Sequence, residues 1–159
     1  MKINAVDING IIKEYDAILT YHSEEYNKHY VVYTDNTYDE SNNLIIKGIA
    51  DRNKNIGRHI IISPLEHSSI IAPCNYLASN GYVIDVLPLN KNGQVDIDAL
   101  KDMIRDDTIL VSICAVNSET GVRQPFRTIR QVNNKFNPNI FSHSDITQAL
   151  GAIPINFND

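Results

Sequence analysis

The chain has 159 residues, of which 43% are hydrophobic and 21% are charged, and its formal net charge is -5 at pH 7. This composition is typical of a globular protein with enough residues for one domain and a buried core, and the acidic balance argues against nucleic acid or an anionic membrane as a partner. No signal-like stretch or apolar run of membrane length occurs, so an intracellular, cytoplasmic protein is expected.

The N-terminal 28 residues have the weakest pattern, although residues 10–19 fit one amphipathic helix. From residue 29 onward, β-branched or apolar runs alternate with segments whose apolar residues recur at helical spacing. The expected strands are residues 29–34, 58–63, 82–87, 108–115 and 139–144. The expected helices are residues 40–50, 67–80, 96–104 and 126–136. This alternation predicts a three-layer α/β domain with a mostly parallel sheet that is covered by helices on both faces.

The two cysteines, Cys74 and Cys114, both lie in apolar periodic segments. Buried free thiols are therefore expected rather than a disulfide, which fits a reducing compartment.

Polar groups follow three of the expected strands at the point where each strand ends. They are Glu66-His67, Asn117-Ser118-Glu119 and Asp145 with Gln148. In sheets of this kind, ligands bind beyond the carboxyl ends of the strands. The three groups together therefore predict a ligand site at that edge.

His67 follows a strand and begins an expected helix. A histidine in this place can stack on a planar ligand or transfer protons. It can equally be a helix-start residue whose side chain bonds to the backbone. Both interpretations stay open from the sequence.

Asp145 lies just after the last expected strand, and Gln148 follows three residues later. A carboxylate buried in this place would pair with a cation, and a pyridinium nitrogen is a good candidate. The alternative is a helix N-cap, because an Asp before Ile-Thr-Gln-Ala-Leu resembles a helix start.

The turn from Asn117 to Gly121 suits ligand contact through Asn117 or Ser118, but turn chemistry explains its Asn and Gly as well. His143 and Asp145 are weak evidence for a metal without a Cys/His cluster elsewhere, so no metal site is expected. The sequence also lacks a glycine-rich phosphate loop and a G-x-S-x-G nucleophile motif.

Taken in order, five motifs resemble the NifS-like cysteine desulfurases of the class V pyridoxal-phosphate-dependent aminotransferases. The resemblance covers roughly residues 30–159, and it implies the fold of the large domain of these transferases, in incomplete form. The matching stretches are residues 40–48 (ESNNLIIKG), 66–70 (EHSSI), 108–113 (TILVSI), 117–125 (NSETGVRQP) and 143–151 (HSDITQALG).

The resemblance implies a role for each site residue in binding pyridoxal 5'-phosphate. His67 stands at the histidine that stacks on the pyridine ring and assists proton transfer, so it is also the catalytic candidate. Asp145 stands at the partner of the pyridine nitrogen, and Gln148 at the amide near the ring hydroxyl or aldehyde. Ser118 stands where the family usually has an asparagine that faces the ring hydroxyl.

Two departures from the family pattern accompany the resemblance. Residues 35–39 (DNTYD) carry two carboxylates and no glycine where the family has a small-residue turn that holds the cofactor phosphate. The family's Schiff-base lysine and its mobile cysteine loop come after the Asp-x-x-Gln motif, whereas the last lysine of this sequence is Lys135. The resemblance therefore implies a truncated protein with weakened cofactor binding and no catalytic competence alone.

Two functions of different classes follow from these features. The first is a NifS-like cofactor-binding domain of cysteine desulfurase descent, which would take sulfur from L-cysteine if a partner completed its site. The second is a non-catalytic remnant or interaction module that forms a homodimer or pairs with a full-length relative. A fragment from a disrupted reading frame is the third interpretation, without a selected activity.

Overall fold

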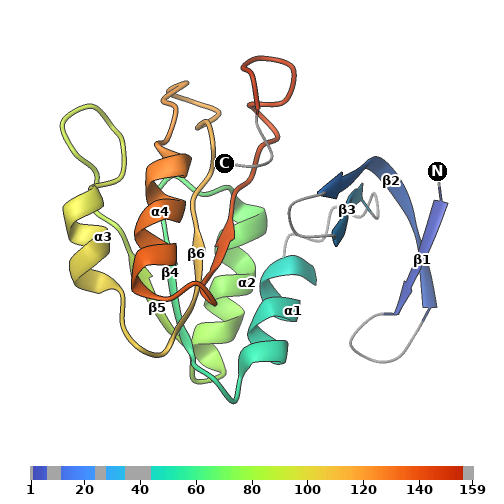
Figure 1. The fold of residues 1–159 in the computed structure, drawn as a ribbon, viewed down its shortest axis with the longest axis horizontal. Coiled ribbons are helices and arrows are strands. Elements are labelled where there is room, and N and C mark those ends of the chain that lie inside the picture. Colours follow the sequence, from blue (N-terminus) through green and yellow to red (C-terminus); the bar gives the residue numbers. More distant parts are fainter. Residues whose placement is uncertain (1, 7–11, 24–27, 35–43, 156–159) are drawn as a thin grey trace. The chain divides into compact units, whose positions relative to one another are not determined.

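The structure is a computed structural model that describes residues 2–6, 12–23, 28–34 and 44–155 (Figure 1). Contacts divide the chain into two compact units, Met1–Asp39 and Glu40–Asp159, and each unit is described by itself. The expectation of a single partial domain over residues 1–159 stays a prediction. The phosphate-turn departure at residues 35–39 lies outside the described residues.

The first unit contains a three-stranded antiparallel sheet in the order β1-β2-β3. Its strands are β1 (Lys2–Val6), β2 (Ile12–Ser23) and β3 (Lys28–Thr34). The strand expected at residues 29–34 is confirmed, but the helix expected at residues 10–19 is wrong. Residues 12–19 belong to β2, whose backbone pairs with a strand on each side, and this pairing outweighs the helical spacing of its apolar residues. The Asn9-Gly10 dipeptide between the first two strands is a hairpin signal that favours this outcome.

The second unit contains a four-stranded sheet in the order β5-β4-β6-β7, and every neighbouring pair is parallel. The strands are β4 (His59–Ile62), β5 (Val83–Val86), β6 (Thr108–Ser112) and β7 (Phe141–His143). The helices are α1 (Leu44–Asn53), α2 (Ser68–Ser79), α3 (Ile97–Met103) and α4 (Phe126–Phe136). The predicted alternation of strands and helices is confirmed for this unit.

The helices cover both faces of this sheet, which gives three layers (Figure 1). On one face, side chains of α1 and α2 such as Ile46 and Ile70 pack with Ile60 and Leu110 of the central strands. On the other face, residues of α3 and α4 such as Leu100 and Ile129 form a second core, which includes Ile61 and Val111 of the same strands. All residues of β4 and β6 are buried, because both faces of these strands meet helices.

Local chemistry sets several of the boundaries. Asp96 is the N-cap of α3, and its Oδ1 accepts hydrogen bonds from the N–H groups of Asp98 (2.9 Å) and Ala99 (3.1 Å). Gly81 follows α2 with a φ of 85°, a left-handed conformation that favours glycine after a helix. Gly57 precedes β4 so close to the backbone carbonyl of Asp107 that a Cβ would clash with it. These positions set where α3 begins, where α2 ends and how closely the segment before β4 approaches the segment before β6.

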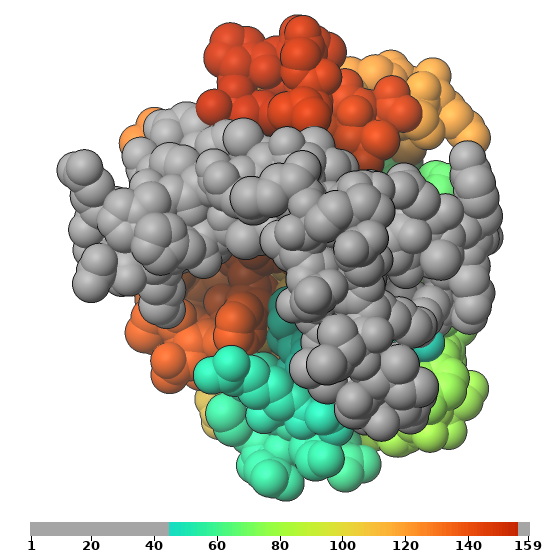
Figure 2. Space-filling model, turned by 90° about the vertical axis from the view of Figure 1, so that its right-hand side faces the viewer, coloured from blue at the N-terminus to red at the C-terminus, as the bar shows by residue number. Residues whose placement is uncertain are grey.

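Seen from the side of α1, the second unit has that helix at one end of the visible face and the segment after β7 at the other end (Figure 2). None of the helices in the described ranges is long and apolar enough to cross a membrane. Cys74 and Cys114 are free and buried, as predicted. Burial raises the pKa of Cys74 to about 12 and that of Cys114 to about 11, so neither thiol ionises near neutral pH.

Candidate functional site

The parallel sheet brings all three polar groups expected from the sequence to the carboxyl ends of its strands. Since β4, β6 and β7 run in the same direction, the residues that follow them lie at a common end of the unit (Figure 1). Strand β6 lies between the other two, so the loop after β4 and the loop after β7 flank the loop after β6. Burial raises the pKa of Glu66, and the charge of Asp145 adds to this rise, which is consistent with this closeness.

Hydrogen bonds continue the pairing of β6 and β7 beyond the strands as far as Asp145. The N–H of Ile113 donates to the carbonyl of His143 (3.0 Å), and the N–H of Ala115 donates to the carbonyl of Asp145 (2.8 Å). The hydroxyl of Ser144 donates to the carbonyl of Ile113 (2.7 Å). The backbone at Asp145 is therefore held by the central strand.

The side chain of Asp145 is half-buried, and it starts a turn rather than a helix. Its Oδ1 accepts a hydrogen bond from the N–H of Thr147 (2.9 Å), as in an Asx turn. The fully buried Ala149 anchors this turn, whereas Gln148 is exposed beside it. One carboxylate oxygen of Asp145 thus shapes the turn, and a carboxylate has lone pairs left to accept from a cationic donor.

His67 is the N-cap of α2, and its side chain is exposed. Its Nδ1 accepts a hydrogen bond from the N–H of Ser69 (3.2 Å) and lies 3.0 Å from the Ser69 hydroxyl. An Nδ1 that accepts from the backbone places the proton of a neutral imidazole on Nε2. The capping role and a ligand role are therefore compatible, because the cap uses Nδ1 and leaves the protonated Nε2 for a ligand.

Ser118 is exposed in the turn that follows β6, next to Asn117. Asn117 itself has a structural role, because its Oδ1 accepts from the N–H of Thr120 (2.9 Å) and its Nδ2 donates to the carbonyl of Leu65 (3.3 Å). This turn is thereby tied to the loop that carries His67. Of the two candidates in the turn, Ser118 is the one whose side chain faces solvent.

Glu66 is a site residue that the sequence patterns placed at the strand end without giving it a role. Its side chain is 6% exposed, and its Oε1 accepts hydrogen bonds from the Ser63 hydroxyl (2.6 Å) and the Cys114 N–H (2.6 Å). Burial raises the pKa of Glu66 to about 7, the nearby Asp145 adds to the rise, and the two hydrogen bonds oppose it. In the sequence, the signal for Glu66 is a carboxylate a few residues after an expected buried strand.

His143 is held by the sheet, because its Nδ1 lies 2.9 Å from the hydroxyl of Ser112 on β6. Burial lowers the pKa of His143, and Asp145 opposes this effect. Within the described residues, no group of three or more His, Cys, Asp or Glu side chains is arranged to hold a metal ion. The arrangement at this edge is thus an exposed imidazole, a half-buried carboxylate and an exposed amide beside a buried acid.

Comparisons with known proteins agree with this fold. A solved structure described as a NifS-like protein has a TM-score of 0.70 and 31% identity, and the match covers 72% of this chain and 32% of that one. A NifS-like protein from Rickettsia africae ESF-5 has a TM-score of 0.60 and 35% identity, with 75% and 31% of the two chains covered. The predicted likeness to the NifS-like fold is confirmed.

Sequence comparisons point to the same group. The cysteine desulfurase IscS of Rickettsia prowazekii is 46% identical over 120 residues, which are 76% of this chain and 29% of that protein. IscS of Methanosarcina thermophila is 42% identical over 116 residues, or 73% and 28% of the two chains. The chain thus spans about 29% of the length of such relatives. The aminotransferase class V family model matches residues 23–159. The chain therefore belongs to the class V aminotransferases, a family that depends on pyridoxal phosphate.

Proposed function

We propose that this chain supplies the ring-binding part of a pyridoxal 5'-phosphate site in a NifS-like cysteine desulfurase. The observation that carries the proposal is that His67, Ser118, Asp145 and Gln148 lie in the segments that follow β4, β6 and β7, which are neighbouring strands of a parallel sheet. The substrate class we propose is L-cysteine, as the names of the similar IscS proteins suggest. A homodimer, or a pair with a full-length relative, is the proposed assembly.

The residues present fit the pyridine ring of this cofactor. Asp145 offers a half-buried carboxylate next to a buried acid with an unpaired oxygen, which is a place that attracts a cationic nitrogen. His67 offers a flat ring whose orientation the α2 cap fixes. Ser118 in the loop after β6 and Gln148 in the segment after β7 each offer an exposed hydrogen-bonding group.

Each of these residues would perform a separate task. Asp145 would hold a proton on the ring nitrogen by pairing with it, and His67 would stack on the ring and donate or accept a proton at Nε2. Gln148 and Ser118 would orient the ring through its polar substituents. When bound, the cofactor itself supplies an electron sink for carbanion chemistry.

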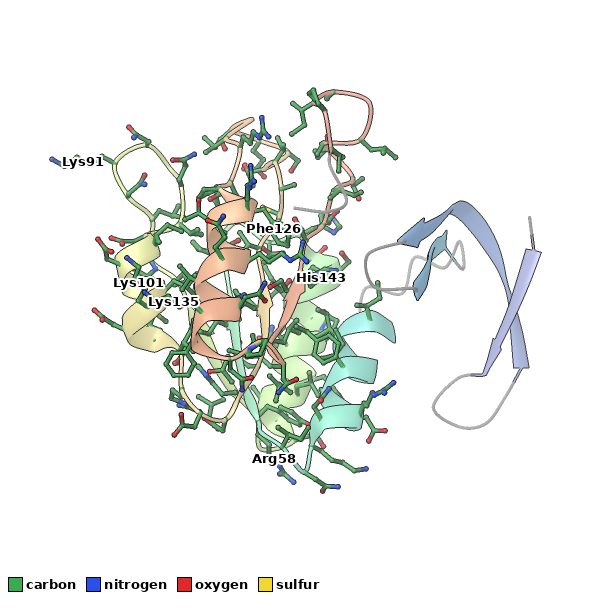
Figure 3. The ribbon with its side chains drawn as sticks, in the orientation of Figure 1. Arg58, Lys91, Lys101, Phe126, Lys135 and His143 are labelled. Carbon is green, nitrogen blue, oxygen red and sulfur yellow. The ribbon has the colours of Figure 1, made fainter. Side chains whose placement is uncertain are left out.

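We also propose that the chain alone does not turn over L-cysteine, because covalent attachment of the cofactor needs a lysine at the site, and the lysines of residues 44–155 lie outside the loops of the proposed site. Within residues 44–155, the amine of Lys54 pairs with Asp51 (2.9 Å), and the amine of Lys101 pairs with Asp98 (2.7 Å). The amine of Lys47 on α1 lies 4.6 Å from the centre of the Tyr76 ring. Figure 3 shows Lys91 projecting outward from the loop between β5 and α3, and Lys135 on α4. None of these residues belongs to the three loops that carry the proposed site.

Replacing Asp145 by Asn is expected to weaken binding of pyridoxal phosphate by roughly 10-fold or more, because a neutral amide no longer pairs with the cationic nitrogen. A titration followed by circular dichroism of the bound cofactor measures the change. The matched control is Asp106→Asn, which removes an equal charge from an exposed residue before β6, at the amino end of the sheet.

Equal affinities for the wild type and both variants would place the cofactor elsewhere. No binding by the wild type, together with a stable complex with a full-length relative, would favour the alternative function of an interaction module.

A further inference from the structure

Glu66 is buried between the loop after β4 and the loop after β6, and its hydrogen-bond partners among the described residues, Ser63 and Cys114, are both uncharged. It accepts two hydrogen bonds at Oε1, whereas its Oε2 is fully buried and has no hydrogen-bond partner among the described residues. A buried carboxylate with a free oxygen is costly when charged, and its protonated form costs less. The structural bond to Cys114 does not explain why this position carries an acid rather than an amide.

The contacts of Glu66 connect the parts of the proposed site. Glu66 is the residue before His67 in the sequence, and its side chain accepts a hydrogen bond from the N–H of Cys114. The next residue, Ala115, donates its N–H to the carbonyl of Asp145 (2.8 Å). Two hydrogen bonds, joined by the peptide link from Cys114 to Ala115, therefore connect the histidine loop through the end of β6 to the backbone of Asp145.

Among the described residues, the ionisable groups that interact electrostatically with Glu66 come from three elements. Cys74 lies on α2, Cys114 follows β6, and Asp145 follows β7. Both thiols stay protonated near neutral pH because burial raises the pKa of each, so Asp145 is the charged neighbour. A negative charge on Asp145 favours the protonated form of Glu66, and neutralising that charge would favour ionisation.

We propose that Glu66 is a proton-linked positioning residue, which holds the His67 loop to the end of β6 and releases its proton when a cation pairs with Asp145. The electrostatic link between Glu66 and Asp145 is proposed for the chain without any cofactor. Its role in cofactor binding rests on the proposed function. Binding of a cationic ring at the site therefore changes the charge of Glu66, which lies in the histidine loop. Glu66 directly precedes His67 in the sequence, so the change in charge occurs at the residue next to the histidine.

The first test uses the full chain without cofactor. Carbon NMR of the Glu66 carboxyl is expected to show a titration whose midpoint moves to lower pH in Asp145→Asn and stays in place in Asp106→Asn. A wild-type midpoint in Asp145→Asn would overturn the proposal. The reciprocal measurement covers the case in which Asp145→Asn does not fold: the Asp145 carboxyl of the wild type should report the Glu66 titration as a second step, and this step should vanish in Glu66→Gln. Its persistence in Glu66→Gln would also overturn the proposal.

The second test adds pyridoxal phosphate and counts the protons exchanged on binding, by calorimetry near pH 7 in buffers of different ionisation enthalpy. Glu66→Gln keeps an acceptor for Cys114 but has no proton to release, so it should release fewer protons than the wild type. Equal proton counts would contradict the proposed linkage to the cofactor. If the wild type binds no cofactor, the proposed function fails, while the measurement without cofactor still decides the link between Glu66 and Asp145.

Discussion

Raising the pH from about 4.5 to about 7 is expected to lower the free energy of unfolding of the wild type by roughly 3 kcal/mol relative to Glu66→Gln. The pKa of Glu66 is raised to about 7 in the folded protein, whereas an unfolded chain has the ordinary value of 4.5. Between these values the folded state keeps a proton that the unfolded state has released. The stabilisation is therefore complete below pH 4.5 and is lost as the pH rises through 7.

Urea unfolding of both proteins across this pH range measures the difference. Burial lowers the pKa values of His59 and His143, which gives a pH dependence of opposite sign. Both histidines are present in the wild type and the variant, so their contributions cancel when the two curves are subtracted. Parallel stability curves would show that Glu66 has the same pKa in the folded and unfolded states.

Leu110→Ala is expected to lower the free energy of unfolding by about 2–5 kcal/mol, because it removes a large side chain from a site that cannot refill the space. Leu110 has 0% exposure on the central strand β6, where it packs in the core formed with α1 and α2. Chemical denaturation measures the change. Leu150→Ala is the matched control, since Leu150 is 57% exposed and its loss should change stability by less than about 0.5 kcal/mol. Equal losses in the two variants would contradict the assigned core.

The second unit was predictable from the sequence because its signals are local. Continuous apolar runs mark β4 and β6, which are buried on both faces, and helical spacing marks α2 and α4. Boundaries were less accurate. The strand expected at residues 108–115 ends at Ser112, and His67 caps α2 instead of lying inside it.

The first unit was predicted less well because sheet pairing is not local. The spacing of apolar residues within 10–19 favoured a helix, but β2 is stabilised by partners from outside that window. The same limit applies to Glu66, whose main partner, the N–H of Cys114, lies 48 residues away in the sequence. The order of the strands, which puts β6 between β4 and β7, was also beyond local patterns.

The most direct test of the account is an NMR titration of the chain with pyridoxal phosphate, in which every backbone amide is followed. The account predicts that the loops after β4, β6 and β7 respond together, with the largest shifts at His67, Ser118, Asp145 and Gln148. Shifts confined to surface lysines such as Lys91, or spread over unrelated faces of the unit, would contradict it.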